Sequence, residues 1–427
     1  MGPRVRIIGL GIHVPEPVLT NEELERGMPW LHTSAAWIRE HTGILERHVA
    51  PREHHAADLG YLAAEEALRL AAVAPEEVDL LLLATNTSQF VYPAGAARIQ
   101  ARFGTDDRGD LRMRKAGALD LQQGCSSFVG AIGLARGLIA AGQFRTVLCV
   151  GADVATRMVD WSDRDAILLG DAAAACVLTG DEGRGGFEYP AFEVLGQFMR
   201  TDPVMADAIR QPGVLNVAND PFSFIGRDFT GEGAELRRQL YGSGFQPDLA
   251  NGRAPFFQMD GRKVYRFVKR IVPRQGYLEV LRSSGLLGDA PAALGLDAVE
   301  SLEDVGDRER RQEIAAWLAT KVDLFVPHSA NLSLNQELAE EMGIPYERMY
   351  VTLHKYANTS AASVGLSLYE ALRQPSRYDT LTKRDGKGEV KVESRAIVTP
   401  ALERGQVALL LSFGAGNSWN YVVTRRL

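Results

Sequence analysis

Continuous apolar runs alternate along this chain with stretches whose apolar positions recur at helical spacing. Runs of four to eight apolar residues, bounded by Gly or polar residues, are typical of strands that are covered on both faces. The periodic stretches at 57–72 and 94–103 predict helices. The strand-like runs occupy 5–11, 78–85, 146–151 and 172–178. Strands and helices that alternate in this way predict an α/β protein.

The second half of the chain repeats the order of the first. The run at 78–81 corresponds to 322–325, and the run at 147–151 corresponds to 407–411. The strand that starts at Gly170-Asp171 corresponds to 414–416 and 421–423. We therefore expect two similar halves, 1–185 and 186–427, with one pocket between their equivalent loops.

Cys125 is the first candidate for chemistry. The segment 118–131 predicts a short apolar strand, a tight Gly turn and a helix that opens at Cys125. Free N–H groups and the positive end of the helix dipole would lower the pKa of a thiol there and favour thiolate. The alternative is a buried core cysteine. Cys149 and Cys176 lie inside apolar runs and are expected in the core.

Two polar residues of the second half stand where predicted strands end. His328 follows the run at 322–326, and Asn358 follows 351–353. In open α/β sheets, ligands bind beyond the carboxyl ends of the strands. A neutral imidazole and an amide side chain placed there can both donate hydrogen bonds to one developing oxyanion. The alternative is that each residue caps the helix that follows it.

Composition narrows the functional classes. The chain has 427 residues, of which 46% are hydrophobic, and a formal net charge of −7, which argues against nucleic acid as a partner. No apolar run is long enough for a membrane span, and the first residues lack a signal-peptide pattern. The three cysteines lack metal-ligand spacing. We therefore expect a cytoplasmic protein with no metal site and no disulfide framework.

Four motifs, in their order along the chain, resemble β-ketoacyl-ACP synthase III of the thiolase superfamily. They lie at 120–128, 327–331, 358–363 and 413–416, and the resemblance extends over nearly the whole chain. It implies a thiolase-like α/β fold, with two duplicated halves in a five-layered αβαβα sandwich. It also implies a homodimer and a Cys-His-Asn catalytic site.

The resemblance assigns roles to individual residues. Cys125 matches the acylated nucleophile, and His328 and Asn358 match the pair that stabilises the charge formed when a malonyl thioester loses carbon dioxide. The backbone N–H of Cys125 and one near Gly416 would form the oxyanion hole for acyl transfer. The implied partners are an acyl-CoA and a malonyl-type thioester, on coenzyme A or an acyl carrier protein. Coenzyme A is thus part of the substrate, and no cofactor is expected.

Further positions carry over to substrate binding. Trp37 and Arg164 match the pair that sandwiches the adenine of coenzyme A. Tyr92 stands where the family places a Phe that reaches into the partner's acyl pocket, although an ordinary interface Tyr is an alternative. Asn331 matches an Asn near the catalytic His, held by a water or by the His itself.

Several positions depart from the family pattern. Ser329 replaces a common Gln, and the helix expected at 333–341 has an acidic face that would repel an acidic carrier protein. A basic helix that begins at Arg262 could instead dock a carrier protein or the phosphates of coenzyme A, or could simply be solvated. Asn417 stands where the synthases often carry a Phe that is linked to decarboxylation.

Three insertions lengthen the chain near 200–256, 286–314 and 375–399. The first is rich in Gly, Pro and Phe, and we interpret it as a lid over the substrate or as a surface excursion. The second reads as a surface helix or loop. Within the third, residues 381–392 read as a hairpin with a Gly-containing turn.

Three functions fit these observations. The first is a decarboxylative Claisen condensation of an acyl group on Cys125 with a malonyl-type thioester, in specialised polyketide or fatty-acid-like biosynthesis. The second is transfer of the acyl group from Cys125 to a hydroxyl or amine. The third is a non-catalytic partner subunit, against which the intact Cys125, His328 and Asn358 argue.

Overall fold

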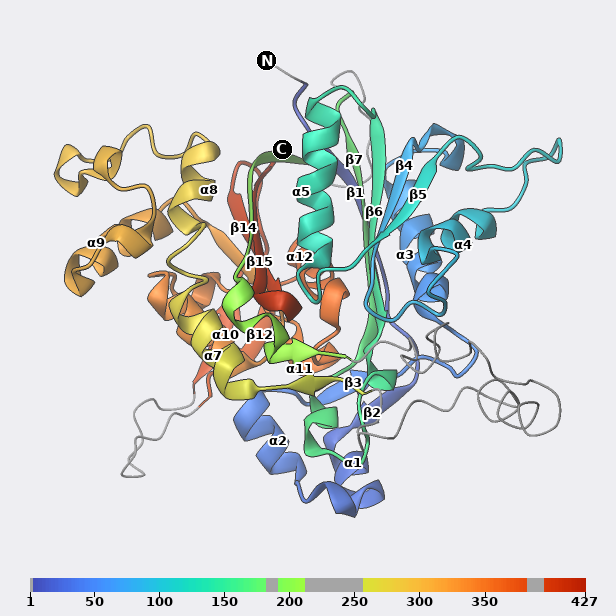
Figure 1. Ribbon diagram of the computed structural model, residues 1–427, viewed down its shortest axis with the longest axis horizontal. Coiled ribbons are helices and arrows are strands. Elements are labelled where there is room, and N and C mark those ends of the chain that lie inside the picture. The colour runs from blue at the N-terminus through green and yellow to red at the C-terminus, as the bar shows by residue number, and fades with distance from the viewer. Residues whose placement is uncertain (1–2, 182–190, 212–255, 382–394) are drawn as a thin grey trace, which may run out of the picture.

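A single large sheet dominates the computed structural model of the protein, which describes residues 3–181, 191–211, 256–381 and 395–427 (Figure 1). The sheet has nine strands in the order β11-β14-β15-β8-β1-β7-β6-β4-β5. Three two-stranded ribbons, β2-β3, β9-β10 and β12-β13, lie apart from it.

The first half of the chain supplies five strands of the large sheet. Its elements are β1 Arg6–His13, β2 Val18–Thr20, α1 Asn21–Gly27, α2 Ala35–Thr42, β3 Glu46–His48, α3 Ala56–Leu70, β4 Leu80–Ala84, α4 Gly95–Arg102, β5 Gly117–Leu121, α5 Ser127–Ala140, β6 Thr146–Val154 and β7 Asp171–Thr179.

The second half supplies the other four strands. Its elements are β8 Phe192–Thr201, β9 Ile209–Arg210, β10 Gln258–Met259, α7 Gly261–Arg270, α8 Tyr277–Ser283, α9 Arg308–Ala319, β11 Leu324–Pro327, α10 Leu332–Glu341, α11 Leu353–Tyr356, α12 Ser363–Ala371, β12 Ser376–Asp379, β13 Ala396–Thr399, β14 Val407–Gly414 and β15 Ser418–Arg426.

The pairing of the strands confirms the duplication. In the first half β4 is parallel to β6, and β6-β7-β1 continue antiparallel; in the second half β11 is parallel to β14, and β14-β15-β8 continue antiparallel. The two half-sheets join where Arg6 and Ile7 of β1 pair with Glu193 and Phe192 of β8. At the position of β5, the second half has one parallel bridge between Phe325 and Met349.

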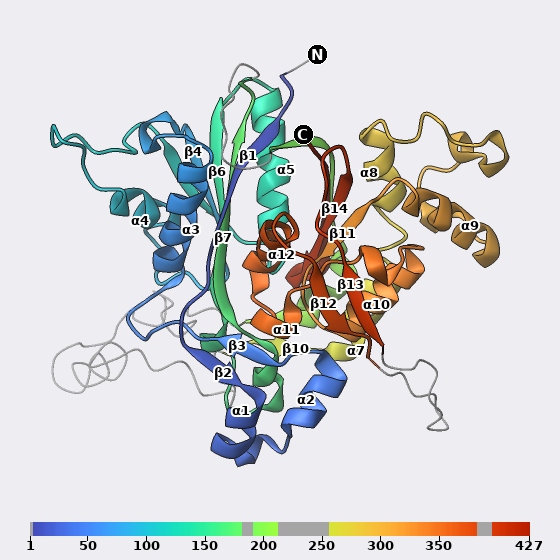
Figure 2. The same ribbon diagram turned by 180° about the vertical axis from the view of Figure 1, so that it is seen from behind.

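Helices form three layers around the two half-sheets, which confirms the five-layered thiolase-like sandwich. α5 and α12 stand between the half-sheets, α3 and α4 cover the outer face of the first, and α8 packs on the outer face of the second (Figures 1 and 2). β4 shows why its run is continuously apolar. Leu80 and Leu82 join the core of the central helices, whereas Leu81 and Leu83 join the core under α3.

The expected boundary between the halves and most of the first insertion lie outside the described residues. β7 ends at Thr179 and β8 begins at Phe192, so the boundary at 185 remains a prediction. The first insertion is described only up to 211 and again from 256, where β9 and β10 pair at its two ends. Its Phe222, Phe224, Phe229 and Phe245 are not described, and the lid remains a prediction.

The other two insertions are described in part or in full. The second contains short 3₁₀ helices at Ala292–Leu294, Leu296–Ala298 and Leu302–Asp304, followed by the start of α9. In the third, β12 and β13 form an antiparallel pair that flanks the stretch expected to be a hairpin, most of which is not described. Within the described ranges, no helix combines the length and apolar character that a membrane span requires.

Candidate active site

Cys125 lies between the end of β5 and the start of α5. The chain turns through Gly124, which has a φ of +58°, and α5 begins at Ser127 with Ser126 as its N-cap. The tight Gly turn is therefore confirmed. We expect the helix to begin at Cys125, but it begins two residues later. The reason is that residues 123–126 form the turn.

Two glycines allow the halves to meet at this cysteine. A Cβ atom on Gly124 would lie 2.5 Å from the backbone N of Ala415, and one on Gly414 would lie 2.5 Å from the backbone N of Cys125. Real Cβ atoms do not approach other atoms so closely, so any side chain at either position would force the backbones apart. The turn after β14 therefore lies directly against the nucleophile.

The environment of the thiol corrects one expectation. Cys125 retains some exposure as a residue, but its thiol is enclosed by protein, and this burial raises its pKa to about 11. A hydrogen bond of 3.4 Å between Sγ and the Ser360 Oγ acts in the opposite direction. The lowered pKa expected from a helix N-terminus is thus wrong, because burial raises the pKa of the thiol.

His328 follows β11 and is held in one orientation. Its backbone N–H donates to the carbonyl of Leu411 at 2.7 Å, and its Nδ1 lies 2.6 Å from the Oγ of Ser363. The ring of Phe413 stands edge-on at 5.3 Å between centroids. Burial lowers the pKa of His328 to about 3, so the imidazole is neutral at physiological pH. Nε2 is left as the ring nitrogen available to the cavity.

Asn358 is held by hydrogen bonds on both sides. Its backbone N–H donates to the carbonyl of Leu168, and its own carbonyl accepts from Gly170, both at 3.0 Å. Its Oδ1 accepts from the N–H of Ser360 at 2.9 Å. Because the oxygen is used in this way, the Nδ2 group remains as a donor. Neither catalytic candidate caps a helix, since Asn331 caps α10 and Ala362 precedes α12.

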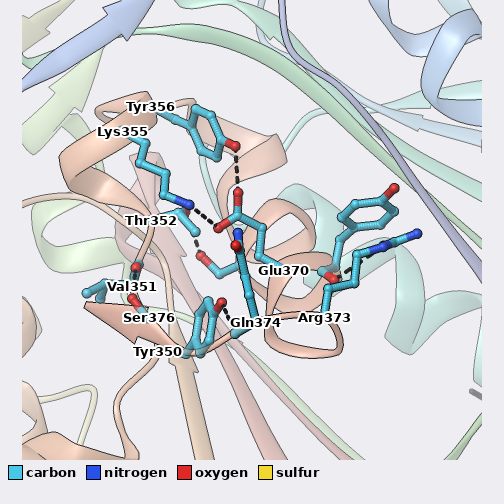
Figure 3. A network of polar contacts seen from close by, with 11 residues as sticks. Tyr350, Val351, Thr352, Lys355, Tyr356, Glu370, Arg373, Gln374 and Ser376 are labelled. Atoms are coloured by element: carbon cyan, nitrogen blue, oxygen red, sulfur yellow. Dashed lines mark hydrogen bonds and ion pairs between the residues drawn. The ribbon is translucent and has the colours of Figure 1, made fainter. Parts of the chain in front are cut away.

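A buried polar cluster fixes the segment that carries Asn358. Glu370 of α12 accepts hydrogen bonds from Lys355 Nζ at 2.8 Å and from Tyr356 OH at 2.6 Å (Figure 3). Thr352 and Ser367 are joined by a hydroxyl–hydroxyl bond of 2.9 Å. These contacts tie α11 to the central helix α12, immediately before Asn358.

Two cavities meet at Cys125. The first, of about 250 Å³, is lined by Cys125, His328 and Asn358, and its other walls are mainly apolar. The second, of about 320 Å³, shares Cys125 and Asn358 and includes Gly416. The apolar wall of the first is formed by Leu168, Leu169, Ile209, Phe257, Met259, Val264, Phe267, Leu334 and Phe413. The structure therefore brings the three catalytic candidates together in one largely apolar cavity.

Trp37 and Arg164 lie together but line neither cavity. The guanidinium carbon of Arg164 is 4.6 Å from the centre of the Trp37 ring, and His41 stacks on Trp37 at 4.2 Å. A planar group between Trp37 and Arg164 would need van der Waals contact on both sides, about 7 Å in all. The pair must therefore open before it can sandwich an adenine, and that role remains a prediction.

The other expected binding residues are dispersed. Tyr92 is 84% exposed and lies outside both cavities, and Arg262 is exposed at the start of α7. Asn331 lines the first cavity, but it is not held by His328. Its Oδ1 caps α10 and its Nδ2 donates to the carbonyl of His41 at 3.1 Å.

The helix expected to present an acidic face is covered at Glu337 and exposed at Glu340. Glu337 of α10 is only 8% exposed, and it is bonded to Lys269 Nζ at 2.9 Å and to the hydroxyl of Tyr265. Because α7 packs on α10 through these contacts, the predicted repulsion of a carrier protein loses its basis at Glu337.

Sequence reasoning missed three residues of the site. Ser360 contacts the thiol, Ser363 contacts His328, and Phe413 packs against the imidazole. All three belong to motifs that were recognised, but nothing in the sequence showed which way they point. Asn417 is buried and lines neither cavity, and the aromatic ring beside His328 is that of Phe413.

Comparison with known proteins agrees with this geometry. Models of 3-oxoacyl-[acyl-carrier-protein] synthase III and of its C-terminal domain match residues 119–197 and 313–379. The β-ketoacyl-[acyl-carrier-protein] synthase III of Alkalilimnicola ehrlichii is 31% identical over 421 residues, and that of Xanthomonas campestris pv. campestris 29% over 421, each covering 98% of both chains. The crystal structure of the Aquifex aeolicus synthase III has a TM-score of 0.67 at 27% identity and covers 99% of both chains. The chain therefore belongs to the β-ketoacyl-[acyl-carrier-protein] synthase III family of condensing enzymes.

Proposed function

We propose that this protein is an acyltransferase that joins an acyl group, loaded on Cys125, to a malonyl-type thioester by decarboxylative Claisen condensation. The observation that carries the proposal is the shared cavity. The Cys125 thiol, the neutral imidazole of His328 and the amide of Asn358 all line it. His328 Nε2 and Asn358 Nδ2 are both left available as donors, which is the arrangement that an enolate requires.

The first step is thioester exchange at Cys125. The sulfur attacks the acyl carbonyl carbon, the new carbon–sulfur bond forms, and the bond to the donor's sulfur breaks. The thiol proton leaves with the displaced thiolate, so the exchange is balanced and nearly thermoneutral. The oxyanion would be stabilised by backbone N–H groups of Cys125 and of the turn that ends at Gly416.

The second step is decarboxylation of the malonyl thioester. The electrons of the breaking carbon–carbon bond pass into an enolate, and carbon dioxide leaves. One well-aimed donor to such an oxyanion is worth about 3 kcal/mol in a dry site. Because the pKa of His328 is about 3, its imidazole stays neutral and donates without first losing a proton.

The third step forms the product. The enolate carbon attacks the carbonyl of acyl-Cys125, the new carbon–carbon bond forms, and the Cys125 thiolate leaves. The apolar walls around the thiol favour this outcome, because water there would protonate the carbanion before it could attack. The chemistry draws on the chain's own residues, and coenzyme A takes part only as the carrier of a substrate.

The basic face of α7 favours a thioester substrate whose carrier is negatively charged. Arg262, Arg266, Lys269 and Arg270 line a surface hollow that shares Gly261 and Tyr265 with the wall of the first cavity. Cations at this position suit the phosphates of coenzyme A or the acidic surface of an acyl carrier protein. A role in specialised biosynthesis and a cytoplasmic location remain predictions.

The experiment is intact-protein mass spectrometry after exposure to a panel of acyl-CoAs, followed by malonyl-CoA or malonyl carrier protein. We expect an acyl adduct that is absent in Cys125→Ala and that malonyl thioester discharges with release of carbon dioxide. The charge reversal Arg266→Glu should slow the discharge by whichever malonyl carrier the enzyme uses.

Two outcomes would contradict the proposal. An adduct that survives malonyl thioester, but is discharged by an alcohol or amine, would favour acyl transfer to such an acceptor. The absence of an adduct with every CoA and carrier-protein donor would favour the non-catalytic subunit.

A further inference from the structure

A chain of polar groups runs from Cys125 into the core of the first half. Cys125 Sγ lies 3.4 Å from the Oγ of Ser360. That oxygen lies 3.1 Å from the Nδ2 of Asn86, and the same nitrogen lies 3.1 Å from the Oδ2 of Asp153. This series of polar groups thus begins at the reacting sulfur and ends at the carboxyl group of Asp153, which is fully buried in β6.

The direction of these hydrogen bonds is fixed by Asp153. Its carboxylate accepts from Thr85 Oγ1, the N–H and Nδ2 of Asn86, Thr87 Oγ1 and the N–H of Ala361. The Asn86 amide must therefore direct its nitrogen, not its oxygen, at the carboxylate. The second hydrogen on Nδ2 is donated to Ser360 Oγ. The hydroxyl of Ser360 already accepts this bond, so its own hydrogen is left for the sulfur.

The backbone of Ser360 is held in a costly conformation. Its φ is +53°, in the left-handed region that residues with a Cβ atom seldom adopt, and the side chain is only 4% exposed. The Oδ1 of Asn358 accepts its N–H at 2.9 Å and maintains this turn. A serine that stays in such a conformation beside a reactive group is a feature that strained functional sites share.

We propose that Ser360 is a catalytic residue whose hydroxyl donates a hydrogen bond to the Cys125 thiolate. Asn86 and Asp153 are positioning residues that orient this hydroxyl. The proposal rests on the proposed role of Cys125 as nucleophile. Ser360 would act twice in each turnover. It stabilises the negative charge that develops on the sulfur as it attacks the acyl donor, and it stabilises the thiolate that leaves when the carbon–carbon bond forms.

The electrostatics of the site are consistent with this role. Burial raises the pKa of the Cys125 thiol, and the hydrogen bond from Ser360 is the main interaction that lowers it. A donor favours the charged form of an acid, so the loss of Ser360 must move the pKa of Cys125 further upward. The other titratable or charged groups that border the two cavities or end the polar chain are Asp153, Asp165, Arg210, Tyr265 and His328.

The experiment is the pH dependence of Cys125 alkylation by iodoacetamide, followed as intact mass. Alkylation needs no thioester, so it tests Ser360 whether or not the protein condenses acyl groups. Ser360→Ala should move the midpoint upward by about one pH unit, the size of shift that a charge-assisted hydrogen bond gives. At a fixed pH below the midpoint, alkylation should be about tenfold slower than in the wild type.

Asn86→Leu tests the positioning role without altering Ser360. It should move the midpoint in the same direction by less, and it should add little to Ser360→Ala in the double variant, because the two residues act through one hydroxyl. Thr359→Val is the matched control. Among the described residues the buried Oγ1 of Thr359 has no hydrogen-bond partner, so its loss should leave the midpoint unchanged.

Circular dichroism should show that each variant is folded. An unchanged midpoint in folded Ser360→Ala would overturn the catalytic role of Ser360. If that variant does not fold, an unchanged midpoint in Asn86→Leu overturns the chain of polar groups. Fully additive shifts in the double variant would likewise show that Asn86 does not act through Ser360.

Discussion

At the scale of single residues, the site depends on which nitrogen of His328 carries the proton. Burial keeps the imidazole neutral, and a neutral imidazole has one N–H. The Ser363 hydroxyl lies 2.6 Å from Nδ1 and can donate to it, which leaves the hydrogen on Nε2. When Ser363 donates to Nδ1 in this way, it favours the tautomer that carries its hydrogen on Nε2.

Ser363→Ala should slow decarboxylation without slowing the acylation of Cys125. Without the hydroxyl, the proton on His328 is free to move to Nδ1, and the donor to the enolate is lost in part of the population. We expect malonyl-dependent release of carbon dioxide to fall about tenfold, while acylation of Cys125 stays near the wild-type rate.

Acylation is measured by intact mass and decarboxylation by release of labelled carbon dioxide. Ser283→Ala on α8, where the hydroxyl donates to the carbonyl of Val280 in the same helix, is the control. An equal loss of both steps in Ser363→Ala would mean that Ser363 supports the fold or the nucleophile rather than His328.

At the scale of elements, the position of the nucleophile depends on two glycines, Gly124 and Gly414, at which the two halves of the protein meet. Gly414 ends β14 with an extended φ of −176°, so only space, and not backbone strain, requires glycine there. The atom that an added Cβ would meet is the backbone N of Cys125. The strands of the second half thus act directly on a residue of the first.

Gly414→Ala should impair acylation more than stability. A Cβ placed 2.5 Å from Cys125 N must displace the cysteine turn, and misplacement of a reacting group costs roughly ten- to a hundredfold in rate. The loss is measured as the rate of Cys125 acylation. A rate equal to that of the wild type would show that the turn relaxes without moving the nucleophile.

The matched substitution is Gly137→Ala on α5, the helix that follows Cys125. A Cβ there would meet no atom within 4 Å, and alanine in a helix is favoured over glycine by about 0.5–1 kcal/mol. Urea unfolding should therefore show a gain in stability with unchanged acylation.

At the scale of the whole molecule, one exposed apolar segment stands out. Phe90, Val91 and Tyr92 precede a cis proline and are 44%, 75% and 84% exposed. Adjacent large apolar side chains that remain exposed in an isolated chain often mark an interface. The homodimer that the family resemblance implies remains a prediction, and this segment is where we expect its interface.

Sedimentation equilibrium should therefore give about twice the chain mass of 46.6 kDa. Val91→Glu should shift the population toward monomer, because a buried unpaired charge opposes association. Val398→Glu, at a 48% exposed position of β13, is the control and should leave the dimer intact. A monomeric wild type would contradict the assignment of this segment to a dimer interface.

The sequence by itself determined the α/β class, the duplicated halves and the three catalytic candidates. Strand and helix periodicity is local, and a strand end followed by a polar residue places that residue at the ligand edge of the sheet. The apolar runs of β4 and β6 could be read correctly because both faces of these strands are covered.

Only the tertiary structure decided how the site works. The contact between Ser363 and His328 joins residues 35 positions apart, and that between Cys125 and Ser360 joins residues 235 apart. Burial raises the pKa of the Cys125 thiol, and Glu337 is covered by a helix that precedes it by many residues. Such effects depend on which side chains the packed halves bring together, and local periodicity holds no information about that pairing.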